Sequence, residues 1–308
     1  MKNRKMAWAG RSAGLASLLW LGGCSSLDVL DPKGPVGDQL KSLIVESTVA
    51  MLIVVIPTII LTCVFAWHYR ASNTKAEYLK DWDHSSKLEA LMWAVPIVII
   101  LFLGVITYQT SHSLDPYRPL ETSQNTKPLR VEVVALDWKW LFIYPEQGVA
   151  TVNQLAVPVN TPIDFRITSD SVMNAFFIPR LGSMIYAMAG MQTQLHLMAS
   201  EPGDYLGESA NYSGRGFSDM HFRTLAMPAD QFQEWVEKVR ASSDTLDDSS
   251  YVRLAQPSEA NPVAYYAHVT PDLFDQIVAK YNNGMIMDKT TGKMIHVQSA
   301  MSDMNTKE

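Results

Sequence analysis

Two long apolar runs constrain the fold of this chain more than any other feature of its 308 residues. They cover about residues 49–67 and 91–108, and neither contains a charged side chain. Each run is close to the roughly 20 residues that a helix needs to cross the hydrocarbon core of a bilayer. The sequence therefore predicts a transmembrane hairpin, with helices over residues 44–68 and 88–110.

The segment before the hairpin has the pattern of an exported leader. Residues 1–23 combine a basic start, a short apolar core and a small-residue finish, which is typical of a secretory signal peptide. The leader ends in Leu21-Gly-Gly-Cys24, the arrangement in which bacterial lipoproteins acquire a diacylglyceryl group on the Cys sulfur. We therefore expect lipidation at Cys24, followed by an exported link over residues 24–43. The alternative is an ordinary leader with a chance cysteine.

An exported N-terminus also sets the orientation of the hairpin. The first helix then runs inward, the loop 69–87 is cytoplasmic, and the second helix returns the chain to the exported side. Arg70, Lys75, Lys80 and Lys87 in that loop agree with the excess of basic residues in cytoplasmic loops. This predicts a multi-pass protein of the bacterial inner membrane, with its large C-terminal part in the periplasm.

The charge of the chain excludes one class of partner. The formal net charge is −6 at pH 7, and the leader contains basic but no acidic residues, so its removal makes the chain more acidic. Nucleic-acid binding depends on a basic surface, so we expect no nucleic-acid partner. The two cysteines, Cys24 and Cys63, lie in different environments and offer no disulfide framework.

The exported part divides into two regions. Residues 120–228 are rich in short alternating segments such as Leu129–Leu136, separated by Pro, Gly and Asn, a texture that predicts a two-sheet sandwich. From residue 229 to 283 apolar residues recur at helical spacing and tyrosines are frequent, which predicts a helical, aromatic-rich extension. The polar tail 284–308 is predicted to be disordered.

The stretch from Gly207 to Met220 has the outline of a copper-binding loop but few of the ligands. Subunit II of the haem-copper oxidases carries a loop C-x-E-x-C-G-x-x-H-x-x-M, and another His on an earlier strand, D-V-x-H-x-W-x-x-P. This chain resembles that family when the loop is aligned on Gly214 and the strand on Ser171–Pro179. The residues at the ligand positions are Asn174 for the first His, Ser209 and Ser213 for the two Cys, Asn211 for the Glu, Phe217 for the second His, and Met220, which alone is retained.

A single thioether cannot replace the thiolates and imidazoles that a binuclear copper site requires. The chain is therefore most similar to the branch of the family that oxidises quinol, the cytochrome o type ubiquinol oxidases. The resemblance implies a membrane-anchored α+β protein with a cupredoxin-like Greek-key sandwich. It implies a non-catalytic subunit of a proton-pumping quinol:oxygen oxidoreductase with no cofactor in this chain. The partners implied are a polytopic subunit I that holds haem and copper, further small membrane subunits and membrane lipid. Ubiquinol is then the substrate, and cytochrome c is not a partner.

Glu89 permits two interpretations. It precedes the second apolar run, where a carboxylate near a helix N-terminus is mildly favoured by the helix dipole. In the family, a Glu seven residues before a proline, here Pro96, lies at the cytoplasmic mouth of a proton path. The resemblance thus implies that role for Glu89 as a hypothesis.

Two other functions remain possible from the sequence. A copper-bearing cytochrome c oxidase subunit would need Cys and His at the replaced positions. A lipoprotein with a cupredoxin scaffold could instead deliver or bind copper through Met184, Met188 and Met191, although we expect these methionines to serve packing. The segment Asp137–Tyr144 resembles the family's aromatic segment, and we expect Trp138 and Trp140 to pack the sandwich against membrane subunits.

Overall fold

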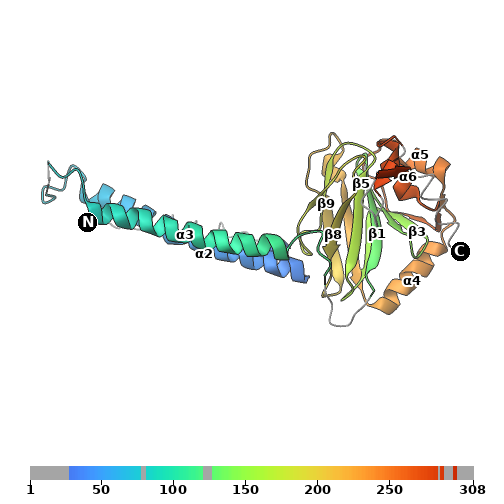
Figure 1. The fold of residues 1–308 in the computed structure, drawn as a ribbon, viewed down its shortest axis with the longest axis horizontal. Helices are drawn as coiled ribbons and strands as arrows, with labels where there is room; N and C mark the ends of the chain where they lie inside the picture. Colours follow the sequence, from blue (N-terminus) through green and yellow to red (C-terminus); the bar gives the residue numbers. More distant parts are fainter. Residues whose placement is uncertain (1–27, 78–80, 121–126, 284, 288–293, 297–308) are drawn as a thin grey trace, which may run out of the picture.

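The computed structural model describes residues 28–77, 81–120, 127–283, 285–287 and 294–296. The leader and Cys24 lie outside the described residues, so the predicted lipidation site has no structural description. A long two-helix hairpin projects from one side of a β-sandwich, and short helices cover the sandwich elsewhere (Figure 1).

The hairpin consists of α2 (Pro35–His68) and α3 (Ser86–Ser113). Both helices are long and apolar enough to cross a membrane, and almost none of their most apolar surface is buried within this chain. Exposed apolar side chains on this scale require lipid or partner helices around them. The predicted pair of spanning helices is confirmed, although α2 begins at Pro35 rather than at residue 44.

The early start of α2 follows from contacts that the sequence did not reveal. The preceding segment, predicted to be an exported link, is bound to loops of the sandwich. The backbone N–H of Lys33 donates to the carbonyl of Arg180 (2.6 Å), and its carbonyl accepts from Ser200 (2.8 Å). A Cβ at Gly34 would lie 2.2 Å from the carbonyl oxygen of Met198. The base of the hairpin is therefore attached to the sandwich by close backbone packing.

The sandwich contains two sheets. Its strands, in chain order, are β1 (Leu129–Leu136), β2 (Lys139–Tyr144), β3 (Val149–Val152), β4 (Gln154–Pro158), β5 (Ile163–Ser169), β6 (Asn174–Phe177), β7 (Ile185–Ala187), β8 (Thr193–Leu197), β9 (Gly203–Ser209), β10 (His221–Met227) and, from the extension, β12 (Ala264–Tyr266). The first sheet has the order β12-β3-β2-β1-β5-β8, and the second has the order β4-β10-β9-β6-β7. The predicted sandwich is confirmed.

The sheet that contains β1 and β2 is buried on both faces. Val131 and Val133 of β1 point into the core between the sheets, whereas Val134 and Leu136 point into a second core. The same division applies to β2, every residue of which is buried. Successive side chains of a strand point to opposite faces, so a strand covered on both sides is mostly apolar on both faces. The exception in β2 is Lys139, whose Nζ donates to the carbonyl of Gln256 (2.8 Å).

The second core is closed by the C-terminal extension. Its helices are α4 (Ala229–Arg240), α5 (Asp248–Leu254) and α6 (Leu273–Lys280), and a small parallel pair joins β11 (Thr245–Leu246) to β13 (His268–Val269). Helices α5 and α6 lie together on the outer side of the β1–β3 sheet (Figure 1). The extension is thus less helical than predicted, because β12 pairs with β3 and continues the sheet.

Two expectations need correction. Part of the tail predicted to be disordered forms an antiparallel pair, β14 (Met285–Met287) with β15 (Met294–His296). Trp140 does not face membrane subunits, because it is fully buried between the sheets. Its ring contacts those of Phe176 and Phe222 edge-on, with centroids 5.4 and 5.8 Å away. A central strand alternates its faces, and position 140 falls on the inner one.

Candidate functional site

The fold brings together the segments that the copper-site resemblance aligned. Strand β9 ends at Ser209 and β10 begins at His221, so the stretch between them is the β9–β10 loop. Strand β6 begins at Asn174 and pairs with β9, with Phe176 opposite Ser209. The start of β6 and the start of the loop are therefore neighbours, as a shared binding site would require.

Neutral hydrogen bonds join these segments. Ser209 is buried and its hydroxyl donates to Oδ1 of Asn174 (3.1 Å), which is fully buried. The Asn174 amide donates in turn to the carbonyl of Val172 (2.9 Å), and the Asn211 amide donates to the carbonyl of Met173 (3.0 Å). We call Asn174, Ser209 and Asn211, with these bonds, the neutral cluster.

The remaining aligned residues divide into two groups. Met220 is buried, and its Sδ lies 3.9 Å from the hydroxyl of Ser213. Phe217 is half-buried and packs edge-on against the exposed ring of Tyr212, with centroids 5.5 Å apart. The structure thus gathers Asn174, Ser209, Ser213 and Met220, whereas Phe217 pairs with a surface tyrosine.

Trp138 determines the shape of the loop. Its indole N–H donates to the carbonyl of Ser213 (3.1 Å). Gly214 has φ +113°, and a Cβ at Gly216 would lie 2.6 Å from the Trp138 ring. Glycine is needed at both positions, first for the backbone conformation and then for the close approach of the indole. Trp138 therefore packs beneath the loop of its own chain, whereas its contact with membrane subunits stays a prediction.

These side chains do not fit a binuclear copper centre. They offer an amide, hydroxyls and one thioether, whereas such a centre needs bridging thiolates and imidazoles. In the part of the chain that the structure describes, no group of three His, Cys, Asp or Glu side chains is placed to hold a metal ion. The hydrogen bonds of the neutral cluster connect β6 to the loop where metal ligation would otherwise do so.

Glu89 lies far from this loop. It is in the first turn of α3, at the end of the hairpin that is remote from the sandwich (Figure 1). Its side chain is mostly exposed, and its Oε2 is 3.5 Å from Nδ1 of His84. The structure therefore places Glu89 and the neutral cluster at opposite ends of the molecule.

A second polar cluster was not recognised from the sequence. The side chain of Asp170, directly after β5, is 1% exposed and accepts three bonds from the extension. The hydroxyl of Tyr251 donates to Oδ2 (2.7 Å), while Lys280 Nζ (2.7 Å) and the Tyr281 hydroxyl (2.8 Å) donate to Oδ1. Burial raises the pKa of Tyr251 above its usual range, and burial together with the Asp170 bond raises that of Tyr281 to about 12. We call these four residues the charged cluster.

The frequent tyrosines of the extension were the sequence signal nearest to this second cluster. Its carboxylate is separated from its donors by about a third of the chain, so no local pattern connects them. Lys280 and Tyr281 are adjacent in the sequence, but their shared acceptor is visible only after folding.

Comparison with known proteins decides the family. The chain is 74% identical to ubiquinol oxidase subunit 2 of Acetobacter aceti over the whole length of both chains. The chain belongs to the ubiquinol oxidase subunit 2 family. It is also 54% identical to cytochrome bo(3) ubiquinol oxidase subunit 2 of Pseudomonas putida, over 94% of this chain and 90% of that protein. The Pseudomonas aeruginosa relative of the same name is 55% identical over 87% of this chain and 80% of that protein.

Two domain families match within this quinol oxidase subunit. The cytochrome c oxidase subunit II periplasmic domain matches residues 130–226, and the COX aromatic rich motif matches residues 240–285. The first match covers the sandwich and the second covers the extension. Membership of this family confirms the predicted subunit of a quinol oxidase, and it contradicts the alternative of a copper-delivery lipoprotein unrelated to an oxidase.

Proposed function

We propose that this chain is a non-catalytic subunit of a proton-pumping ubiquinol:oxygen oxidoreductase, with haem and copper held by a polytopic partner, subunit I. The hairpin would brace the partner within the inner membrane, alongside further small membrane subunits. The sandwich would cover the partner on the periplasmic side. This proposal rests on family membership and on the apolar, uncovered surface of the hairpin.

The assignment of ubiquinol as the substrate rests on the side chains found at the aligned copper-ligand positions. The side chains of Asn174 and Ser209 share a hydrogen bond between uncharged groups, and the Ser213 hydroxyl contacts the thioether of Met220. Quinol is apolar and delivers electrons from within the bilayer, so a relay in the water-exposed sandwich has no donor to serve. A soluble cytochrome c would find no metal in this chain to reduce.

The test compares two electron donors in the whole oxidase. We expect oxygen uptake with ubiquinol and none with reduced cytochrome c, and we expect the separated subunit to contain no copper. Oxygen uptake driven by cytochrome c, or a stoichiometric pair of coppers in this subunit, would contradict the proposal. A complex that keeps full ubiquinol activity without this chain would contradict the bracing role.

Glu89 is proposed to lie at the cytoplasmic mouth of a proton path into the partner. Its exposed position at the remote end of the hairpin supports this, because a proton must be collected from water on that side. Glu89→Gln should slow ubiquinol oxidation and proton uptake together. Glu46→Gln, which makes the same change on α2 towards the sandwich end, is the matched control. Equal rates in the two variants would assign Glu89 to an ordinary interfacial role.

Lipidation of Cys24 and removal of the leader 1–23 are proposed from the sequence alone. The mass of the mature N-terminus measures both modifications directly. Two spanning helices already hold the chain in the membrane, so Cys24→Ser should abolish the lipid without releasing the protein. Release of this variant into the soluble fraction would contradict that expectation.

A further inference from the structure

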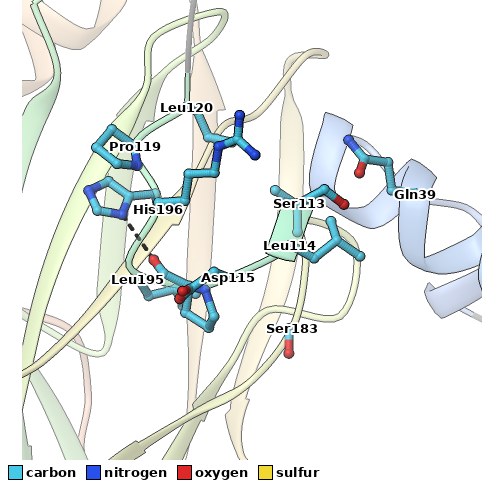
Figure 2. A pocket seen from close by; sticks show the side chains of 12 residues that line it. Gln39, Ser113, Leu114, Asp115, Pro119, Leu120, Ser183, Leu195 and His196 are labelled. Carbon is cyan, nitrogen blue, oxygen red and sulfur yellow. Dashed lines mark hydrogen bonds between the residues drawn. The ribbon is translucent and has the colours of Figure 1, made fainter. Parts of the chain in front are cut away.

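A cavity of about 230 Å³ lies where the sandwich-side ends of the two helices meet the sandwich. Its walls come from Val36 and Gln39 of α2, Ser113 of α3, the linker 114–120 and the end of β8 (Figure 2). This is many times the space that one water molecule needs. Both adjoining helices are long and apolar enough to cross a membrane. The cavity lies beyond the sandwich-side ends of their apolar runs, and therefore on the head-group side of the hydrocarbon core.

The linker wall is fixed to the sandwich. The His196 side chain is 9% exposed, and its Nδ1 donates to the carbonyl of Pro116 (2.9 Å; Figure 2). The same carbonyl accepts from the His196 backbone N–H (3.2 Å). Two bonds to one oxygen hold the linker against β8, so the cavity has ordered walls rather than a gap beside a loose segment.

The cavity has an uncommitted cation. Among the described residues, the Arg118 guanidinium and the Gln39 side-chain amide have no hydrogen-bond or ion-pair partner; both residues are exposed and both line the cavity. The acid in the lining, Asp115, uses its Oδ1 to accept from the backbone N–H of Tyr117 (2.9 Å). Unpaired donors therefore line the cavity next to Asp115, which has one of its two carboxylate oxygens engaged.

The remaining lining is apolar. Leu114, Leu120, Leu195 and Val36 all border the cavity. A cation beside leucines at head-group level matches a molecule with an anionic group joined to an apolar body. A guanidinium binds two phosphate oxygens at once with well-matched geometry, and flanking aliphatic side chains suit the glycerol and the first acyl carbons.

We propose that this cavity binds the phosphate group of a membrane phospholipid, with Arg118 as the principal phosphate ligand and Gln39 as a second donor. The lipid would fill the junction between hairpin and sandwich. The chemistry alone would also admit a soluble phosphate, so the test separates the two sources.

The test uses the whole oxidase in nanodiscs of phosphatidylethanolamine with a minor fraction of phosphatidylglycerol that carries a photoreactive head group. After illumination, cross-links to peptides containing residues 114–120 are quantified by mass spectrometry. Arg118→Gln should lower their yield about tenfold, the effect expected for loss of one charge-assisted hydrogen-bonding group. Arg118→Lys should keep an intermediate yield, because the charge remains.

The control is Arg215→Gln, which removes an exposed arginine of the β9–β10 loop that pairs with Glu259. Its cross-link yield should equal that of the unmodified complex, as should the yield in excess inorganic phosphate. Three results would overturn the proposal. They are equal yields in Arg118→Gln and Arg215→Gln, displacement by inorganic phosphate, which assigns the site to a soluble anion, and no cross-link in the linker at all, which indicates that another subunit fills the cavity.

Discussion

The two polar clusters of the exported part perform similar structural tasks with different chemistry. In the neutral cluster, amides and a hydroxyl tie the β9–β10 loop to β6. In the charged cluster, one buried carboxylate ties the extension to the end of β5 through three donors. A hydrogen bond between uncharged groups makes a net contribution to stability of about 1 kcal/mol, whereas one to a charged group contributes roughly 1.5–3 kcal/mol. The attachment of the extension should therefore depend more on single residues than the shape of the loop does.

The largest effect is expected at Asp170. Asp170→Asn keeps the size of the side chain but turns its amide N–H groups towards donors, and it leaves Lys280 without a counter-ion. Only the carboxylate is buried, because the Lys280 side chain is 58% exposed, so the cost comes from loss of the charged acceptor of these bonds and is about 3 kcal/mol. Hydrogen exchange in the whole oxidase should show the extension opening more readily by that amount. Asp219→Asn, an exposed loop residue, is the control and should leave exchange unchanged.

A smaller effect is expected at Tyr251. Tyr251→Phe removes only the donor to Oδ2 and should lower the opening free energy of the extension by about 2 kcal/mol. Tyr266→Phe is the matched control, because no hydrogen bond of its hydroxyl occurs within the described residues. If both variants exchange alike, the extension is held by its apolar core and the charged cluster contributes little.

The neutral cluster should be less sensitive. Ser209→Ala leaves Oδ1 of Asn174 without its donor and should cost about 1 kcal/mol, measured by exchange of the amides in residues 207–220. Ser218→Ala, an exposed position in the same loop, controls for the loss of a hydroxyl. A larger loss in Ser209→Ala than in Tyr251→Phe would reverse the ranking of the two clusters.

The last prediction concerns alkaline pH, where the clusters should respond differently. The pKa of Tyr281 is raised to about 12, while an unfolded tyrosine ionises near 10. The neutral phenol therefore contributes stability below about pH 10, which is lost as the pH rises towards 12. A protease active in alkali should cut the extension faster over that interval. Tyr281→Phe should reduce this step, and the remainder belongs to Tyr251, whose pKa is also raised by burial. Cleavage within residues 209–220 should not follow the step, because the neutral cluster has no titratable group.

Features that depend on residues close together in the chain are predictable from the sequence, and features that depend on distant residues are not. The spanning runs are local and uninterrupted, so they were identified although α2 begins earlier than predicted. The alternating segments predicted the sandwich, and the spacing of the β9–β10 loop identified its aligned residues. Trp140 was misplaced, because a strand that is apolar on both faces gives no indication of which face meets which core.

The sequence by itself determined the membrane hairpin, the sandwich and the replacement of every aligned copper ligand except Met220. Each depends on the identity and spacing of residues within one segment. Only the tertiary structure decided that residues 28–37 bind the sandwich, that Asp170 accepts hydrogen bonds from the extension, and that a cavity forms beside Arg118. These features depend on groups far apart in the chain, and their distances are fixed only when both cores have packed.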